Sequence, residues 1–492
     1  MTHGTAAEAA GRGYALKAGL LLGAILALKL LLLFWLGASL FPDSFGYVTL
    51  GDDILASRRW LDDGAWLSGP QPLAILRPYG YPLLIALAKL VSPSHFALLI
   101  AAVQCVASLA ALALVAAALA ALVRSTALRY AVMVLAAISG SSLYDVVILS
   151  DSLYASLFIA VVFLIVMEMT GQLRLGAGAL LGLGFLWGAS IWMRDVGLYF
   201  TLFPLIGLAL CERLRAKGIL ALLGSLAAFL LPVAALVAIH MLWNAHRTGH
   251  ALLSVAESVN WLWPSINIET LDLGNPFDGT DLVSRVATSH EIAPGLAGIY
   301  QLVDILWREY GLDPLEIRHA TLSHFLAMLG RHPFAYLATV VHNLQLERLA
   351  NLLLNPLANL NDFLQLGPRA SARVIPGVRE LREMPRAGLF WDAATFGPPL
   401  LALEIVALAG LAILAIGTPL MALGRRRCEP RGRQAAAVFL WLTFMGVIGA
   451  FALLHLEMRY VLPVIPAALV SLGYCLDGVR WRRREASASE HP

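Results

Sequence analysis

Three arginines differ in position from most basic residues of this sequence, because each stands beside a long apolar run. Arg77 lies in LRPYGYPLL, Arg194 in IWMRDVGLY and Arg459 in HLEMRYVLP. A guanidinium group presents parallel N–H bonds that match two oxygens of a phosphate. The three side chains could therefore hold an anionic phosphate. Each could instead reach the membrane surface or pair with an acidic neighbour, as Asp195 offers to Arg194 and Glu457 to Arg459.

One carboxylate, Asp43 in FPDSFGY, directly follows the first apolar run. An acid at that position is either solvated or part of a site, and ionisable groups beside membrane spans are often functional. Tyr47 and the Asp52–Asp53 pair add polar groups nearby. A carboxylate there suits a general base that deprotonates an acceptor hydroxyl. We therefore predict that Asp43 is catalytic and that Tyr47 contacts the substrate. Three further polar side chains of these strings are predicted to contact it as well: Tyr81, His455 and Glu457.

The remaining patterns do not favour a metal or a nucleotide. Asp145 and Asp151, in SSLYDVVILSDSLY, could hold a divalent cation together with Asp43. An Asp directly before Ser152 equally fits a helix N-cap, which we favour for Asp151. No His or Cys spacing matches a zinc site and no P-loop is present, so we expect no metal ligand and no cofactor. The GxGxxxG strings at 176–182 and 182–188 lie inside an apolar run and predict close helix packing.

The elements that position these residues are predicted to be membrane spans. Of the 492 residues, 59% are hydrophobic and only 14% are charged, and the mean hydropathy is +0.75. Soluble domains carry about a quarter charged residues, so a soluble enzyme is excluded. The net charge of +3 gives no indication of nucleic-acid binding. Apolar windows of about 20 residues predict an all-α polytopic membrane protein. The ten predicted spans are residues 17–39, 95–123, 130–149, 152–170, 175–193, 196–211, 219–243, 397–423, 435–454 and 459–478.

The charges of the connections predict the orientation of these spans. With the N-terminus placed in the cytoplasm, the connections on that side hold most of the basic residues, including five arginines between 425 and 433 and four between 480 and 484. The positive-inside rule therefore places both termini in the cytoplasm and leaves two long segments outside. We divide the chain into an N-terminal membrane module, 1–243, with its outer loop at 40–94, an extracytoplasmic segment, 244–396, and a C-terminal membrane module with a basic tail, 397–492.

The larger outer segment, of about 150 residues, is too long for a simple loop. It is predicted to be mainly helical with some irregular or strand structure, beginning with a polar, strand-compatible stretch from 243 to 281. Helical patterns follow at 299–311, 316–330 and 333–355. We interpret the last as an interfacial amphipathic helix, because an eleventh span would place the arginines after residue 424 outside.

The order of four strings resembles the glycosyltransferase C superfamily. PDSFGY follows the first run, then come RPYGYPLLIAL, WNAHRTGHALLS after the seventh run and RYVLPVIPAAL at the start of the last. The chain is most similar to bacterial membrane enzymes related to protein mannosyltransferases and to lipid A aminoarabinose or galacturonic acid transferases. The resemblance extends from about residue 30 to 475 and so covers nearly the whole chain.

This resemblance implies an inverting glycosyltransferase of the bacterial cytoplasmic membrane, with its active site on the outer face. It would transfer a sugar from a polyprenyl-phosphate donor to a hydroxyl of an envelope glycan, lipid or protein. The family's catalytic acid corresponds to Asp43, its phosphate-binding residue of the first loop to Arg77, and the Arg-Tyr of its last span to Arg459 and Tyr460. The aminoarabinose transferases carry Arg three residues after that acid, where this sequence has Gly46.

A lipid-linked saccharide flippase or transporter is the main alternative, and a scaffold for another membrane complex is a further one. A transporter predicts charged residues near the middle of several spans, where they would line a path. The predicted spans hold few, among them Lys29, Glu168 and Glu404, whereas most acidic residues lie on the predicted outer side of the membrane. This distribution favours a reaction site at the outer face. It does not identify the sugar or the acceptor.

Overall fold

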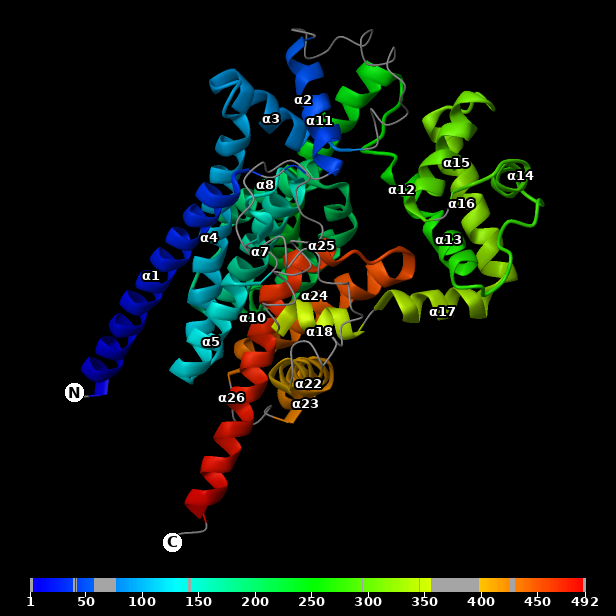
Figure 1. Ribbon diagram of the computed structural model, residues 1–492. Helices are drawn as coiled ribbons and strands as arrows, with labels where there is room; N and C mark the ends of the chain where they lie inside the picture. Colours follow the sequence, from blue (N-terminus) through cyan, green and yellow to red (C-terminus); the bar gives the residue numbers. More distant parts are fainter. Residues whose placement is uncertain are drawn as a thin grey trace.

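Helices make up all the regular structure in the part of the chain that the computed structural model describes (Figure 1). That part comprises residues 3–38, 40, 42–56, 77–139, 143–293, 295–344, 346–354, 398–424 and 430–489. Seven helices within it are long and apolar enough to cross a membrane, and they match seven of the ten predicted spans. Their span-length stretches are Gly13–Leu31, Phe96–Leu122, Ser150–Met169, Ile219–His246, Ile405–Gly424, Arg431–Leu454 and Arg459–Val479.

The other three predicted spans correspond to shorter apolar helices. A crossing needs about 20 apolar residues, so the count of ten spans stays a prediction. The first of the three ends early, before the sequence Ser-Gly-Ser-Ser at 139–142, and Gly and Ser favour loops. The helices are α5 (Thr126–Ala137), α8 (Ala177–Met193), the 3₁₀ turns η2 (Asp195–Gly197) and η3 (Tyr199–Thr201), and α9 (Leu202–Leu210).

Close backbone contact between α8 and α11 (Ile219–Thr248) organises the centre of the bundle. A Cβ atom added to Gly184 of α8 would lie 2.0 Å from the carbonyl oxygen of Phe229, and one on Gly188 would lie 2.7 Å from Cδ1 of Leu236. Any side chain at Gly184 would therefore push the helices apart. The predicted packing is confirmed for the second GxGxxxG string, whereas a Cβ added to Gly176, Gly178 or Gly182 would meet nothing within 4 Å. On its other side α8 packs on α7 (Ser150–Met169), which in turn packs on α4 (Phe96–Leu122).

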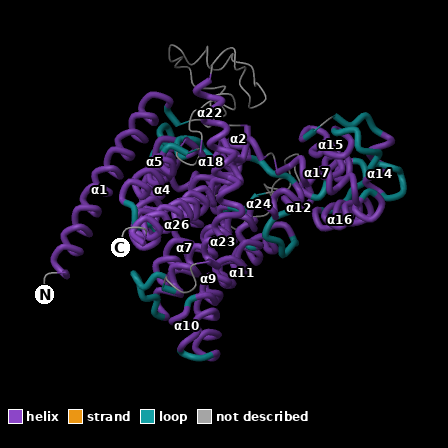
Figure 2. Tube along the Cα trace, turned by 90° about the horizontal axis from the view of Figure 1, so that it is seen from below, coloured by secondary structure: helices purple, strands orange, loops and turns teal. Residues whose placement is uncertain are grey.

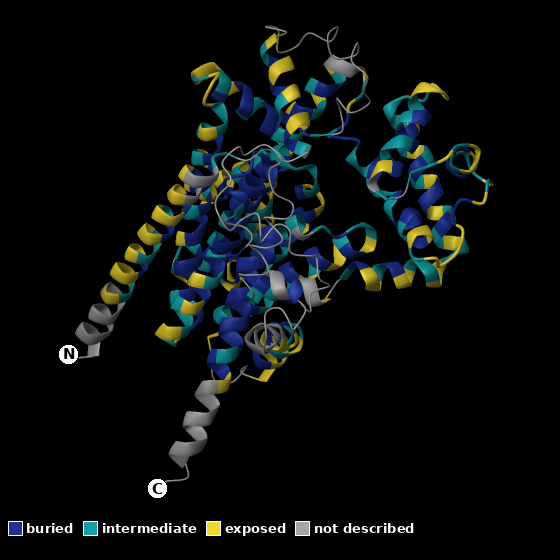
Figure 3. Ribbon diagram, in the orientation of Figure 1, coloured by how far each residue is buried: buried dark blue, intermediate teal, exposed yellow. Residues whose placement is uncertain are grey.

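The rim of the bundle is apolar and exposed, as Figure 3 shows along α1 (His3–Leu36). Leu16 and Phe34 of α1 and Leu220 and Leu242 of α11 are each at least two-thirds exposed. Apolar surface of this extent would promote association in water, whereas in a bilayer it contacts lipid tails. This distribution supports the membrane assignment.

The C-terminal module completes the bundle. Its last helix is the most buried of the membrane-length helices and packs on α24 and α5. The helices of this module are α22 (Pro398–Ala412), the π-helical turn η4 (Ile413–Gly417), α23 (Thr418–Gly424), α24 (Arg431–Leu454), α25 (Met458–Val461), the 3₁₀ turn η5 (Leu462–Val464) and α26 (Ile465–Ser489).

A lobe of short helices projects from one side of the bundle, as Figures 1 and 2 both show. Its own small core includes Leu262, Ile266, Leu302 and Leu306. The strand-compatible stretch from 243 to 281 is helical or in turns wherever the structure describes it, so the prediction of strand there is wrong. Its apolar residues pack at helical spacing into the lobe core. The lobe helices are α12 (Ala256–Asn260), α13 (Trp263–Thr270), α14 (Leu282–Ser289), α15 (Leu296–Arg308) and α16 (Pro314–Arg331).

Two helices lead from the lobe back to the bundle, α17 (Pro333–Leu344) and α18 (Leu346–Leu354). The hydroxyl of Tyr336 donates to the carbonyl of Leu453 at 2.8 Å, and the Asn343 amide donates to that of Ala452 at 3.1 Å. α17 therefore caps the end of α24 and exposes Phe334 on another face. Its amphipathic character agrees with the predicted interfacial helix. Residues 355–397 of the outer segment lie outside the described part.

Charged residues gather at the two ends of the bundle. α2 (Pro42–Ala56) and α3 (Gly80–Val91) lie at the upper end in Figure 1, and both termini lie towards the lower end. At the lower end Arg213 pairs with Glu168 at 2.5 Å, and the Asp477 carboxylate accepts the N–H groups of Arg124 and Ser125. The shared end of the termini agrees with their predicted location on one side of the membrane.

Candidate active site

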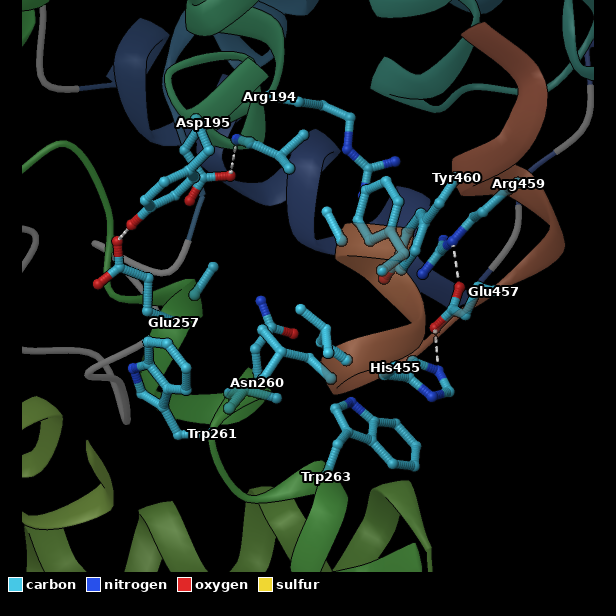
Figure 4. Close-up of a pocket in the computed structure, with 18 of the residues that line it drawn as sticks. Arg194, Asp195, Glu257, Asn260, Trp261, Trp263, His455, Glu457, Arg459 and Tyr460 are labelled. Atoms are coloured by element: carbon cyan, nitrogen blue, oxygen red, sulfur yellow. Dashed lines mark hydrogen bonds and ion pairs between the residues drawn. The ribbon is translucent and has the colours of Figure 1, made fainter. Parts of the chain in front are cut away.

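A cavity of about 570 Å³ lies at the upper end, between the bundle and the lobe (Figure 4). It is lined by residues from widely separated parts of the chain. A volume of this size is typical of small-molecule sites. The predicted site residues that line it are Asp43, Tyr47, Arg77, Arg194, His455, Glu457 and Arg459.

Asp43 is held between two arginines. Its Oδ1 lies 2.9 Å from Nη2 of Arg77, and its Oδ2 lies 2.5 Å from Nη1 of Arg459. Asp43 is also in the first turn of α2, where the helix dipole favours a negative charge. The structure therefore brings together the predicted base and two of the three predicted phosphate ligands, from parts of the chain more than 400 residues apart.

These contacts decide the protonation of Asp43. Burial favours the neutral acid, but the charges and hydrogen bonds of Arg459 and Arg77 outweigh it and lower the pKa of Asp43 to about 2. The carboxylate is therefore ionised at neutral pH. A group with so low a pKa is a weak proton acceptor while both arginines remain on it.

Arg77 is fixed by two residues of α2, Asp43 and Tyr47. Its guanidinium lies over the ring of Tyr47, 4.4 Å from the centroid, and the Tyr47 hydroxyl is 2.8 Å from Oγ of Ser150 at the start of α7. Gly80, three residues later, packs on the backbone of Trp192, where a Cβ would lie 2.5 Å from the carbonyl oxygen. The absence of a side chain at Gly80 lets α3 approach the end of α8.

Arg194 pairs with Asp151 across the bundle, not with the adjacent Asp195 that the sequence offered. Its guanidinium also lies 4.7 Å from the ring centroid of Tyr460. Asp195 instead accepts the hydroxyl of Ser254 in the polypeptide that enters the lobe. Asp151 is not the predicted N-cap, because α7 begins one residue earlier and Leu149 occupies the cap position.

Glu457 connects Arg459 to the stacked rings of His455 and Trp263. It pairs with Arg459, as the sequence predicts, and with His455, whose Nε2 lies 3.4 Å from its Oε1. Burial opposes ionisation, but the His455 hydrogen bond and the charge of Arg459 lower the pKa of Glu457 to about 2. The His455 ring in turn stacks on Trp263 of the lobe, with centroids 3.8 Å apart and planes within 7° (Figure 4).

Tyr81 does not line the cavity, although it is predicted to contact the substrate. Its hydroxyl donates to Oε1 of Gln104 at 2.7 Å, and its ring packs edge-on against Tyr47 at 5.1 Å. The Gln104 amide donates to the carbonyl of Asp145, which itself pairs with Lys29. Tyr81 therefore supports the Tyr47 ring from behind.

The lobe contributes a wall of the cavity that the sequence reasoning missed. Its polar and aromatic side chains come from α12, α13 and α15, and none was singled out before. The string NWLW at 260–263 was the available signal, since two tryptophans beside an amide are unusual in a polar loop. The missed lining residues include Glu257, Asn260, Trp261, Trp263 and Tyr300.

Among the residues that the structure describes, no three His, Cys, Asp or Glu side chains lie close enough to share a metal ion. Asp145 and Asp151, the acids considered as cation ligands, pair with Lys29 and Arg194 respectively. Both carboxylates are thus neutralised by basic side chains of other helices.

No protein-family model, curated protein or solved structure matches this chain. The resemblance to the glycosyltransferase C superfamily therefore stays a prediction from the sequence strings. Functional reasoning depends on the cavity and the groups around it.

Proposed function

We propose that the protein is a membrane glycosyltransferase that moves a sugar from a polyprenyl-phosphate donor to an acceptor hydroxyl. One observation carries the proposal: a carboxylate and three arginines from widely separated parts of the chain converge on one cavity at a single end of an apolar helix bundle. A base beside a cationic cluster is what this transfer requires. The base accepts the acceptor's proton, and the cations stabilise the leaving phosphate.

The proposed reaction is a single displacement at the anomeric carbon. Asp43 takes the proton from the acceptor hydroxyl, and the acceptor oxygen forms a bond to that carbon. The bond from the carbon to the phosphate oxygen breaks, and its electron pair leaves with the polyprenyl phosphate. Arg77, Arg459 and Arg194 stabilise the negative charge that grows on the phosphate. Attack opposite the leaving group inverts the anomeric centre.

Donor binding would also convert Asp43 into a better base. Without donor, both carboxylate oxygens are occupied by Arg77 and Arg459. A donor phosphate between these arginines competes for their N–H groups and places a like charge near the carboxylate. Both effects raise the pKa of Asp43 from about 2. The base therefore becomes effective only when the leaving group is in position.

The cavity is also suited to an amphiphilic donor. Part of its wall is apolar and is formed by Phe325 and Leu329 of α16 with Leu453 and Leu454 of α24. These residues lie beside the end of a membrane-length helix. A polyprenyl chain could run along this wall into the bilayer while its phosphate meets the arginines.

A transporter receives less support from the same structure. In the described part of the chain the charged side chains buried between the spans are paired, including Lys29 with Asp145 and Glu168 with Arg213. Paired charges of this kind stabilise helix contacts and do not present free charge to a moving substrate. The cavity lies at one end of the bundle.

The test is donor consumption. Membranes containing the protein are incubated with a panel of radiolabelled polyprenyl-phosphate sugars, and loss of label from the lipid is scored. Consumption of at least one donor, absent from membranes without the protein, is expected. We further propose that the cavity opens on the outer face of the bacterial cytoplasmic membrane. A reporter fused after Arg427 should then be active in the cytoplasm, and periplasmic activity would contradict the topology.

A further inference from the structure

Three polar groups of the lobe line the cavity with no hydrogen-bond partner among the residues that the structure describes. They are the side-chain amide of Asn260, the indole N–H of Trp263 and the hydroxyl of Tyr300. All three side chains are half-buried. Polar groups in such places normally bond to protein, ordered water or a ligand. In Figure 4 the Asn260 amide points into the cavity.

These groups surround an aromatic surface that is held rigidly. Trp263 stacks on His455, and His455 is oriented by Glu457. Trp261 packs on Phe325 with centroids 5.0 Å apart. The electron-rich face of an aromatic ring attracts the partly positive C–H groups of another molecule. Such a surface therefore suits a flat ligand whose faces carry C–H groups.

The surface also adjoins the reacting groups. Tyr300 belongs to α15 of the lobe, and its hydroxyl is near enough to Arg77 and Asp43 to interact with their charges. Trp263 reaches the Arg459 side of the cavity through His455 and Glu457. A ligand ring on this aromatic surface would therefore have one edge towards Asp43 and its remaining polar groups towards Asn260.

We infer that Asn260, Trp263 and Tyr300 form a subsite for a sugar ring, whose C–H face packs on the aromatic surface and whose hydroxyls bond to the three polar groups. A sugar combines an apolar face with a rim of hydroxyls, and a hydroxyl both donates and accepts. The inference rests on the proposed function. The ring could be that of the donor or one in the acceptor, and both present the same chemistry.

The experiment compares three variants with the wild-type full-length protein: Asn260→Leu, Trp263→Phe and Tyr300→Phe. Each removes one hydrogen-bonding group and keeps most of the side-chain volume. Tyr310→Phe is the matched control, because Tyr310 lies in the lobe but is exposed and outside the cavity lining. Two probes are bound to each protein: the polyprenyl-phosphate sugar, and a polyprenyl methyl phosphate that has the same single charge and no sugar.

A donor sugar in the subsite predicts that each variant binds the polyprenyl-phosphate sugar about 3- to 10-fold more weakly, the usual effect of one hydrogen bond. Binding of the polyprenyl methyl phosphate by each variant should stay within about 2-fold of its binding by the wild type, because this probe has no sugar hydroxyls. An acceptor sugar predicts unchanged binding of both probes and a KM for the acceptor raised by the same factor. The Tyr310→Phe control should match the wild type throughout.

Unchanged donor binding together with an unchanged acceptor KM in all three variants would overturn the subsite and leave the glycosyltransferase proposal intact. Equal weakening of both probes would also overturn it, because the effect would then not depend on the sugar. The opposite result can also be recognised. If the wild type transfers no sugar but binds the sugar probe more tightly than the methyl probe, and the variants lose that difference, the subsite is supported and the proposed transfer is refuted.

Discussion

Replacing Asp43 by Asn should strengthen binding of the donor while abolishing its turnover. Asp43 and the donor phosphate both require Arg77 and Arg459, and in the free protein the carboxylate occupies both. Asn has the same size but no charge, so it competes less well for the guanidinium groups and does not repel the phosphate. A merely solvated acid would give no such effect.

The magnitude follows from the pKa of Asp43, which is lowered from its ordinary value of 3.8 to about 2. One pKa unit corresponds to 1.36 kcal/mol, so the arginines, after the opposing effect of burial, favour the charged carboxylate by a net of about 2 kcal/mol. Removing this competitor can strengthen donor binding by up to about 30-fold. Because the side chain is 26% exposed and part of the interaction is screened, we expect a gain of about 5- to 30-fold.

The assay measures equilibrium binding of a polyprenyl-phosphate sugar without acceptor, by the wild type and by Asp43→Asn, at neutral pH. The donor is a phosphodiester with one constant charge, so its own titration does not contribute. Asp52→Asn is the matched control, because Asp52 lies on the same helix, pairs with Lys89 and is outside the cavity lining. Equal or weaker donor binding by Asp43→Asn, with an unchanged thermal midpoint, would refute competition for the arginines.

Three further predictions concern the groups around the site. Arg77→Ala should lower kcat/KM for the donor by about 10- to 100-fold, the effect of a charged hydrogen bond. Arg77→Lys should restore only part of this loss, because Lys lacks the parallel N–H groups of a guanidinium. Kinetics equal to those of the wild type in both variants would reject phosphate binding by Arg77. Lys29→Met should destabilise the protein by about 3–5 kcal/mol, because it leaves Asp145 charged and buried. Adding Asp145→Asn should recover part of the loss in thermal midpoint. A double variant with no such recovery would mean that Lys29 and Asp145 are not coupled. Asp43 and Glu457 both have a pKa lowered to about 2. The stabilisation that these two carboxylates give the folded protein is therefore complete above about pH 5 and is lost as the pH falls towards 2. A thermal midpoint that stays constant across that range would contradict the ion pairs.

The position of the site could be predicted from the sequence because span ends are constrained. Residues at the same-side ends of antiparallel spans must share one face of the bundle, whatever the packing between them. Asp43 and Arg459 were each assigned to such an end and Arg77 to the outer loop on the same side, and the three meet. The pairing of Glu457 with Arg459 was predictable for a simpler reason, since only one residue stands between them along the chain.

Contacts that depend on how spans pack could not be predicted in the same way. Arg194 had an acid beside it in sequence, yet it pairs with Asp151 of another helix, because the extended end of α8 turns it away from Asp195. The lobe was harder still. Its helices are short and have no span-length pattern, so apart from the tryptophans of NWLW nothing in the sequence indicated that Asn260 and Tyr300 would line the same cavity as Asp43. That juxtaposition is produced by the docking of the lobe on the end of the bundle.

Turnover by the purified protein tests the central claim most directly. The wild type, Asp43→Asn and the control Asp52→Asn are compared for release of polyprenyl phosphate from a donor that the wild type consumes. Loss of a general base lowers turnover by about 10²- to 10⁴-fold, and we expect this for Asp43→Asn alone, with donor binding retained. Turnover of Asp43→Asn near that of the wild type would contradict the assignment of Asp43 as the base.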